Sequence, residues 1–310
     1  MSQIKATIVA DSYSAVNGKR ITTFELEYPR WIHGEILTHR LFSRNAMSSR
    51  AVPIEKMIEQ VRTNPAKPMH WGKNQAGMQA KEELFEVDRN EVKYEWASAA
   101  KNAAVSAESM SENGLHKQVV NRILEPFQLM KTVLTSTEFD NFFWLRKHAD
   151  AQPEIKELAE RMYEQLEWNK LFTVELDSGD WHTPYYEGGY WLKESETPLE
   201  DALAISSSCC AQVSYRLLDD SIEKARKVYQ RLVESTPVHA SPFEHQAAPI
   251  DFVLNPTSES QWEMNIDKMH FVKGVTHADK DGNLWSGNLK GWIQYRQLID
   301  GNVCNKFEEK

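Results

Sequence analysis

The strongest constraint on the fold lies near the N-terminus, where two candidate strands flank a tight turn. Residues 5–9 and 21–28 have the composition of strands, and Asn17-Gly18 between them is the strongest short signal for a hairpin. In the second strand, apolar and polar residues alternate: Phe24, Leu26 and Tyr28 against Thr23, Glu25 and Glu27. A strand with this alternation buries one face. The hairpin therefore predicts a sheet with one buried face.

A helix and then a polar run are predicted directly after this hairpin. Pro29 suits the first turn of a helix, because its missing N–H is not needed there, and apolar residues follow at helical spacing. These residues are Trp31, Ile32, Ile36, Leu37 and Leu41. The run Thr38–Arg50 then contains three arginines, three serines, a histidine and an asparagine, and we expect it to form a loop or turn.

Two interpretations of this polar run remain open from its residues alone. Ser48, Ser49 and Arg50 could offer hydroxyls, backbone N–H groups and a guanidinium fork to one phosphate. Alternatively, the run is a solvated basic helix end, which the helix dipole favours.

Further along the chain, hydrophobic periodicity predicts several helices and a few strands. Helices are expected at 91–112 with an end at Asn113-Gly114, at 115–134, on both sides of Pro153, at 202–212, after a cap at Ser221, and at 292–299. Strands are expected near Phe252 and Met264 and at 269–275, and short helices with a loop at 51–90. The chain is thus expected to combine helices with strands.

Composition narrows the class of protein. The 310 residues are 41% hydrophobic and 26% charged, which suits a soluble globular chain with a large core. The net charge of −9 argues against general nucleic-acid binding. We expect no membrane segment and no signal peptide, since no apolar run approaches the required ~20 residues. The three cysteines, Cys209, Cys210 and Cys304, indicate a reducing, cytoplasmic compartment without a disulfide framework.

Three groups of residues, in the same order as in a known family, resemble the flavin-dependent thymidylate synthases (thymidylate synthase complementing proteins). The family signature is Arg-His-Arg, seven residues, Ser; here it is matched by His39, Arg40 and Ser48, with Ser43, Asn45 and Arg50 in register and Thr38 at the first arginine. The family's Arg-Ile-x-x-Pro helix is matched by Arg122, Ile123 and Pro126. Its Asn-to-Arg segment followed by Ala-Gln-x-Glu-Ile is matched by Asn141, Arg146 and residues 151–155.

Two further matches stand in an unusual place in the chain. His239–His245 resembles the family's His-x-Thr-Pro-Phe-Glu-His motif, with Ser241 for threonine, and Ser214 lies in a match to its Ala-Arg-Val-Ser segment. In usual members these motifs precede the arginine signature, whereas here they follow it. The resemblance therefore implies a circular permutation, which a fold tolerates when the old termini lie close together. It predicts that residues 21–28 share a core with residues 243–252.

The resemblance also implies a fold and an activity. We expect one permuted α+β domain over residues 1–310, with a mixed or antiparallel sheet packed with helices, in which residues 255–310 form an extension without a match. Family members methylate dUMP at C5, with methylenetetrahydrofolate as carbon donor and with NADPH as reductant through FAD. They are homotetramers with shared active sites and use no enzymic nucleophile on C6.

Carried over by resemblance, the site residues fall into three roles. Ser48 and Arg146 would be catalytic. The nucleotide would be bound by Glu35, which stands at a family glutamine position, and by Ser48, Ser49, Arg50, Arg122 and Arg146. FAD would be bound by His39, Arg40, Asn45, Asn141, Ser214, His239, Ser241 and Glu244. No metal is expected, because the spacing of His239, Glu244 and His245 fits no standard zinc pattern.

Three departures from the family pattern keep other functions open. Thr38 removes a cation, Ala46 replaces a usual glutamate beside the pyrimidine, and Asp150 stands where a histidine is common. Unpaired polar groups decide which substrate is accepted. One alternative is therefore a flavin enzyme that hydroxylates or hydroxymethylates dUMP or dCMP. Another is a non-catalytic nucleotide-binding protein. From the residues alone, His239 and His245 could also be structural histidines, and Arg146 could be the rim of an amphipathic helix.

Overall fold

The computed structural model describes residues 2–213, 219–251, 272–304 and 306–307. Its helices are α1 (His33–Leu37), α2 (Ile54–Thr63), α3 (Glu86–Glu112), α4 (Lys117–Ile123), α5 (Asp140–Arg146), α6 (Pro153–Asn169), α7 (Leu199–Gln212) and α8 (Ile222–Glu234). Short 3-10 helices are η1 (Arg30–Ile32), η2 (Glu125–Phe127), η3 (Ser241–Glu244) and η6 (Tyr295–Leu298). In this part of the chain, none of the helices combines the length and apolar character needed to cross a membrane.

The principal sheet is built on the predicted hairpin. Its order is β3-β4-β2-β1-β5, formed by β1 (Lys5–Ser14), β2 (Arg20–Pro29), β3 (Ser43–Ala46), β4 (Leu129–Ser136) and β5 (Val174–Leu176). β1 and β2 pair antiparallel, and Gly18 has a φ of 70° in the turn between them, where a side chain would be strained. β5 pairs parallel to β1, so the sheet is mixed. The α+β expectation is confirmed.

The strand β4 corrects one sequence prediction. Residues 115–134 were expected to form one helix, but the helix α4 ends at Ile123 and the chain continues through η2 into β4. In β4 every residue except Lys131 is buried, because one face, with Leu134, packs into the main core and the other, with Val133, packs on Cys210 and Val213. A strand buried on both faces shows no alternation, so periodicity cannot separate it from a buried helix.

The strand β3 corrects a second prediction. The run Thr38–Arg50 was expected to be a loop or turn, yet Ser43–Ala46 pairs antiparallel with β4. The preceding helix is also shorter than expected: it ends at Leu37, and Leu37 and Leu41 are 47% and 41% exposed. Polar residues can form this strand because β4, which pairs with it, supplies the hydrogen bonds.

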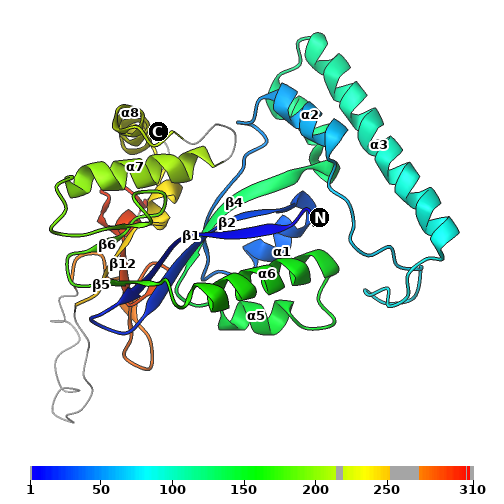
Figure 1. Cartoon of the computed structure of the whole chain (residues 1–310). Coiled ribbons are helices and arrows are strands. Elements are labelled where there is room, and N and C mark those ends of the chain that lie inside the picture. Colours follow the sequence, from blue (N-terminus) through cyan, green and yellow to red (C-terminus); the bar gives the residue numbers. More distant parts are fainter. Residues whose placement is uncertain (1, 214–218, 252–271, 305, 308–310) are drawn as a thin grey trace.

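The main core lies between the sheet and the helices that cover it. Figure 1 shows α5 and α6 side by side below the sheet and α3 extending away from it. Phe24, Leu26 and Tyr28 are fully buried, as their alternation predicts, and they belong to one cluster with Phe142 of α5 and Leu158 of α6. As expected, Pro153 begins α6, and the Gln152 side chain caps it by accepting from the Ile155 N–H.

A second set of strands is formed by the later part of the chain. A four-stranded sheet has the order β12-β8-β6-β7, from β6 (Trp181–His182), β7 (Tyr190–Trp191), β8 (Ala247–Pro249) and β12 (Trp292–Gln294). A three-stranded sheet has the order β11-β10-β9, from β9 (His277–Ala278), β10 (Leu284–Ser286) and β11 (Leu289–Lys290). Residues 292–299, expected to be helical, therefore form β12 and η6. An apolar run buried in a sheet again carried no strand signal.

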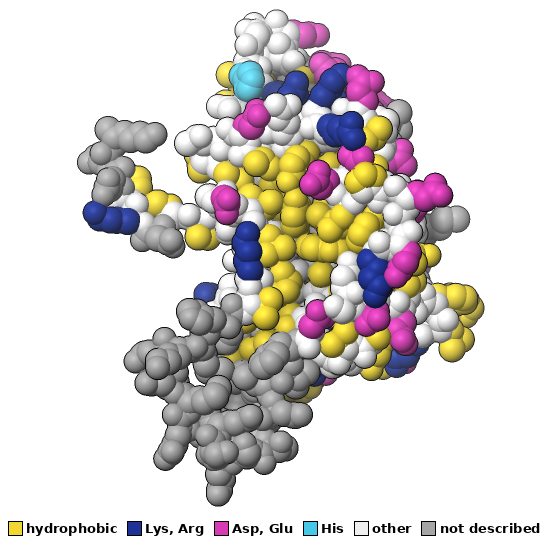
Figure 2. All heavy atoms as spheres, turned by 90° about the vertical axis from the view of Figure 1, so that its left-hand side faces the viewer, with side chains coloured by type: hydrophobic (Ala, Val, Ile, Leu, Met, Phe, Trp, Pro, Cys, Tyr) yellow, Lys and Arg dark blue, Asp and Glu magenta, His cyan; other side chains and the backbone are white. Residues whose placement is uncertain are grey.

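Three smaller expectations have mixed outcomes. α7 is confirmed, and α8 begins after Ser221, but the Ser221 hydroxyl donates to Asp219 instead of capping the helix. The strands expected near Phe252 and Met264 lie outside the described residues, as do 269–271 of the strand expected at 269–275, whose described part, 272–275, is not a strand. Figure 2 shows hydrophobic side chains gathered in a broad patch on the side of the molecule that lies at the left in Figure 1.

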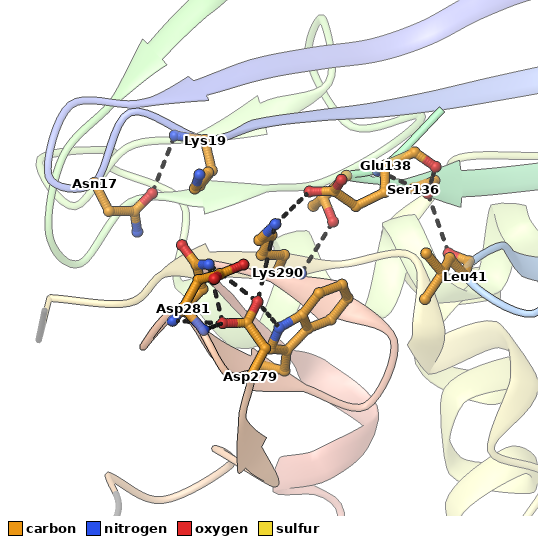
Figure 3. Close-up of polar contacts among 11 residues, drawn as sticks. Asn17, Lys19, Leu41, Ser136, Glu138, Asp279, Asp281 and Lys290 are labelled. Atoms are coloured by element: carbon orange, nitrogen blue, oxygen red, sulfur yellow. Dashed lines mark hydrogen bonds and ion pairs between the residues drawn. The ribbon is translucent and has the colours of Figure 1, made fainter. Parts of the chain in front are cut away.

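The expected shared core between residues 21–28 and 243–252 is present at one end of the strand. Ile21 packs with Ala247, Leu289 and Trp292 in a buried cluster. Lys290 strengthens this junction: its Nζ lies 3.4 Å from Glu138, and Figure 3 shows it between Glu138 and Asp279. This ion pair links the β10–β11 hairpin, which contains Lys290, to the segment that leads from β4 into α5.

A chain of buried polar side chains crosses between the two sheets. The Ser12 hydroxyl is 2.9 Å from His182 Nδ1, and His182 Nε2 is 2.9 Å from Thr23 Oγ1. Thr23 Oγ1 is 2.6 Å from Thr135 Oγ1, which is 2.9 Å from His245 Nδ1. Burial lowers the pKa of both His182 and His245 to about 3, so both rings are neutral at neutral pH.

The two neutral histidines in this row of buried polar side chains predict a loss of stability in mild acid. Because both folded-state pKa values lie below the ordinary value of 6.5, the unfolded state binds more protons between pH 6.5 and 3. The stabilisation is complete above pH 6.5 and falls as the pH is lowered. At pH 5 the two histidines together should lower the free energy of unfolding by about 4 kcal/mol.

Urea unfolding at a series of pH values measures this effect. The free energy of unfolding should be constant between pH 7 and 8 and decrease steadily from pH 6.5 to 5. Equal urea midpoints at pH 7 and pH 5 would contradict the neutral buried histidines.

Candidate functional site

Eight of the fourteen predicted site residues lie in three side-chain clusters, each of which includes residues of the segment from η1 to Arg50. We name each cluster after the residue at its centre: the Arg146 cluster, the Glu244 cluster and the Glu125 cluster. The Arg146 cluster joins Arg146 to Glu35, Thr38 and His39. The Glu244 cluster joins η3 to β3 and η6, and the Glu125 cluster joins η2 to η1, α4 and the turn after β3.

The Arg146 cluster brings together three residues that the resemblance placed in the site. Arg146 Nη1 donates to Glu35 Oε2 at 2.7 Å, and Arg146 Nε donates to His39 Nε2 at 3.0 Å. Arg146 is the last residue of α5, whose Phe142 packs edge-on against the His39 ring with centroids 4.9 Å apart. The packing of α5 on His39, just after the end of α1, therefore positions this guanidinium.

The charge state of the Arg146 cluster is well defined. Burial and the nearby Arg146 lower the pKa of His39 to about 4, so the ring is neutral at neutral pH. His39 Nε2 accepts from Arg146, which places the ring proton on Nδ1. Glu35 balances the charge of Arg146. The cluster thus presents a neutral ion pair with unused guanidinium N–H groups.

The Glu244 cluster connects the Pro-Phe-Glu-His element with β3. The Ser241 hydroxyl donates to Asn45 Oδ1 at 3.3 Å, and Asn45 Nδ2 donates to the Cys210 carbonyl at 2.6 Å. Glu244 forms an ion pair with Arg296. Burial raises the pKa of Glu244, and Arg296 and Arg44 oppose that shift. The two motifs that are far apart in the sequence are therefore in direct contact.

Two residues of the Glu244 cluster were missed from the sequence. Arg296 pairs with Glu244, and the Gln294 amide lies 3.0 Å from Ser43 Oγ and 3.2 Å from the Glu244 carbonyl. Both belong to residues 255–310, which matched nothing in the family. In the sequence, Gln294 and Arg296 stand out only as polar residues within an apolar run, and this pattern identifies no partner for them.

The Glu125 cluster lies at the turn that follows β3. Glu125 Oε1 accepts from Ser49 Oγ at 3.2 Å and from Arg122 Nη1 at 2.8 Å, and it lies 3.1 Å from Arg30 Nη2. The buried Asn121 of α4 fixes the turn by donating to the carbonyl of Ser49 at 2.6 Å. Arg30, Asn121 and Glu125 were not identified from the sequence, because the fold alone brings Asn121 and Glu125 to Ser49 and Arg30 to Glu125.

The remaining predicted residues stay apart from these clusters. The side chains of Arg40, Arg50, Asn141 and His239 are exposed, and within the described ranges no hydrogen bond or ion pair joins them to another residue. Ser214 lies outside the described residues. His245, one of the two possible structural histidines, is buried in the polar chain described above.

Within a single polypeptide chain, the residues predicted to bind the nucleotide form two groups. Arg122 and Ser49 belong to the Glu125 cluster, and Arg146 and Glu35 belong to the Arg146 cluster. The segment Arg30–His39 connects the two, because Arg30 belongs to the first cluster and His39 to the second. At the rise of a helix this segment is about 14 Å long. Their convergence on one nucleotide stays a prediction.

The donor set suits the dinucleotide that the resemblance implies. Arg40 and His239 present uncommitted N–H groups at the surface, and Ser241 and Asn45 are joined to each other by a hydrogen bond. Guanidinium groups bind phosphate oxygens in bidentate fashion, and amide and hydroxyl groups bind the polar edge of a flavin ring. The residues present therefore fit FAD.

The comparisons with known proteins decide the family. The sequence profile of the thymidylate synthase complementing protein family matches residues 8–168, just over half of the chain. The chain belongs to this family. The matched range contains every residue of the Arg146 and Glu125 clusters, whereas η3 and Arg296 lie beyond it. A search of curated proteins found no match.

Solved structures that resemble this family member are distant in sequence. The UMP/dUMP methylase PolB from Streptomyces cacaoi, bound with 5-Br UMP, is 19% identical with a TM-score of 0.45, covering 55% of this chain and 91% of PolB. The flavin-dependent thymidylate synthase ThyX from Helicobacter pylori, complexed with FAD and dUMP, is 19% identical with a TM-score of 0.34, covering 49% and 70%.

Proposed function

We propose that this protein is a flavin-dependent thymidylate synthase. It would methylate dUMP at C5, with methylenetetrahydrofolate as carbon donor and NADPH as reductant through FAD. The observation that carries the proposal is the contact of Arg146 with His39 of the signature and with Glu35, inside the range that matches the family. In line with the family resemblance, we also propose a cytoplasmic homotetramer with shared active sites.

The roles of the residues follow from their remaining hydrogen-bonding capacity. Arg146 has five N–H groups, of which Glu35, His39 and Thr38 use three. The two others can donate to a carbonyl oxygen of the pyrimidine. Ser48, Ser49, Arg50 and Arg122 would hold the phosphate, and Arg40, Asn45, Asn141, His239, Ser241 and Glu244, with Ser214, would hold FAD. FAD supplies the hydride that reduces the transferred carbon.

The cysteines agree with a mechanism that uses no enzymic thiolate. Burial raises the pKa of Cys209 to about 12 and raises the pKa of Cys210 well above its ordinary value. Both are therefore thiols at neutral pH. Cys304 is exposed and lies outside the three clusters.

The order of the motifs supports the proposal of one permuted domain. Asn17 Nδ2 in the first turn donates to the Ile250 carbonyl at 3.0 Å. The end of the segment that carries the Pro-Phe-Glu-His element therefore lies beside the start of β2. A direct connection between the two would restore the usual family order.

A second candidate is a flavin enzyme that hydroxylates or hydroxymethylates dUMP or dCMP. It is favoured by the carboxylate of Glu35, bound to Arg146 where the family has a glutamine, and by Ala46, which supplies no carboxylate to the pyrimidine. A carboxylate can accept a hydrogen bond from the amino group of cytosine. A non-catalytic nucleotide-binding protein is the third candidate.

The mass of the product distinguishes these candidates. The purified protein should have the absorption spectrum of a flavin and, with NADPH and methylenetetrahydrofolate, should increase the mass of dUMP by one methylene unit. A hydroxymethyl or hydroxyl product, or a preference for dCMP, would support the second candidate. A colourless protein that binds nucleotide without turnover, even after FAD is added, would support the third.

A further inference from the structure

The Glu125 carboxylate has the surroundings of a bound phosphate oxygen. A single oxygen, Oε1, lies within reach of three donors: Ser49 Oγ, Arg122 Nη1 and Arg30 Nη2, at 3.2, 2.8 and 3.1 Å. Hydroxyl and guanidinium donors that converge on one anionic oxygen are the usual ligands of phosphate. Glu125 thus satisfies the same groups that a nucleotide phosphate would need.

The cluster also contains an N–H group that Glu125 does not bind and positive charge that Glu125 does not neutralise. Arg30 Nη1 is shielded from solvent and has no hydrogen-bond partner among the described residues. Two guanidinium groups face one carboxylate, so the cluster keeps a net positive charge, and Arg50 lies next in the chain to Ser49. A buried N–H without a partner is costly, and a second anionic oxygen would remove that cost.

Glu125 is able to leave this position. It begins the short helix η2, and its side chain is 26% exposed, so solvent is within reach of a different rotamer. Arg122 is 57% exposed, whereas Asn121 keeps the Ser49 turn fixed by donating to the Ser49 carbonyl. Ser49 therefore stays in place when the carboxylate moves.

We propose that Glu125 is an internal competitor for the phosphate of the nucleotide, and that Arg30 is an additional phosphate ligand. The proposal rests on the proposed function for the assignment of Ser49 and Arg122 to the phosphate. In the free protein Glu125 holds the three donors together, and an incoming phosphate monoester displaces it. A dianion competes better than a singly charged group, because it gains more from two guanidinium ions. Glu125 would therefore set the affinity for the phosphate and the selectivity against nucleosides.

The test compares the wild type with Glu125→Gln, which keeps the shape of the side chain and removes its charge. The dissociation constants of inorganic phosphate and dUMP are measured by calorimetry in phosphate-free buffer of constant ionic strength. We expect Glu125→Gln to bind inorganic phosphate and dUMP at least tenfold more tightly, and deoxyuridine unchanged. Unchanged or weaker binding of inorganic phosphate would overturn the proposal.

Two further variants test whether the effect depends on where the negative charge is removed and on the Arg122 donor. Glu108→Gln removes the same charge from the surface ion pair with Arg62 and should leave phosphate binding unchanged. The double variant Glu125→Gln/Arg122→Gln should lose the gain, because the donor that the phosphate would use is gone. A gain that persists in the double variant would also overturn the proposal. Tighter phosphate binding without any binding of dUMP would contradict the proposed function and leave the role of Glu125 intact.

Discussion

Replacing Arg146 by alanine is expected to weaken dUMP binding more than tenfold. The guanidinium offers a charge-assisted contact to the pyrimidine, and such a contact contributes about 1.5–3 kcal/mol. The substitution also leaves Glu35 without its cationic partner, so an uncompensated carboxylate would remain next to the base. Calorimetric titration of the holoprotein with dUMP measures the change.

Arg161→Ala is the matched control for this prediction. Arg161 also belongs to a helix and pairs with a glutamate, Glu157, but on α6 and away from the three clusters. It should bind dUMP as the wild type does. If Arg146→Ala folds with the thermal stability of the control and keeps the wild-type affinity, Arg146 does not belong to the nucleotide site.

Replacing Asp11 by alanine is expected to lower the free energy of unfolding by about 3–5 kcal/mol, the usual cost of removing one partner of a buried ion pair. Asp11 is 6% exposed and accepts from Arg20 Nε at 2.9 Å, from Thr22 Oγ1 at 2.8 Å and from Asn169 Nδ2 at 2.7 Å. These bonds connect the hairpin to the end of α6. Without the carboxylate, Arg20 would be left as a partly buried cation without compensation.

Urea unfolding at pH 7 measures the loss. Lys5→Ala removes an exposed ion pair from the same two strands, the contact of Lys5 with Glu27, and should cost less than about 1 kcal/mol. A similar small cost for Asp11→Ala would show that the network around Asp11 does not hold α6 to the hairpin.

Local patterns predicted two elements, although Thr23, on the polar face of β2, is also buried because His182 and Thr135 cover it. The β1–β2 hairpin was predictable because Phe24, Leu26 and Tyr28 alternate with polar residues and because Gly18 permits the turn. The start of α6 was predictable because Pro153 at the first helical position follows a capping Gln152. In both cases, neighbouring residues supply the physical cause.

Elements buried on both faces were not predictable in this way. β4 and β12 were predicted to be helical, since an apolar run without polar alternation fits either structure. β3 was predicted to be a loop because its residues are polar, and only the edge of β4 makes it a strand. Hydrogen bonds between distant strands decide such segments.

The same distinction between local sequence and tertiary contacts applies to the candidate site. The sequence by itself identified the family, the signature residues His39 and Ser48, and the arginines Arg122 and Arg146, because these are matched residue by residue within short motifs. Only the tertiary structure placed Arg146 on His39, Arg296 on Glu244, and Arg30 and Ser49 on Glu125. Each of these contacts joins side chains from different elements. Their partners are set by strand pairing and helix packing, which sequence spacing does not encode.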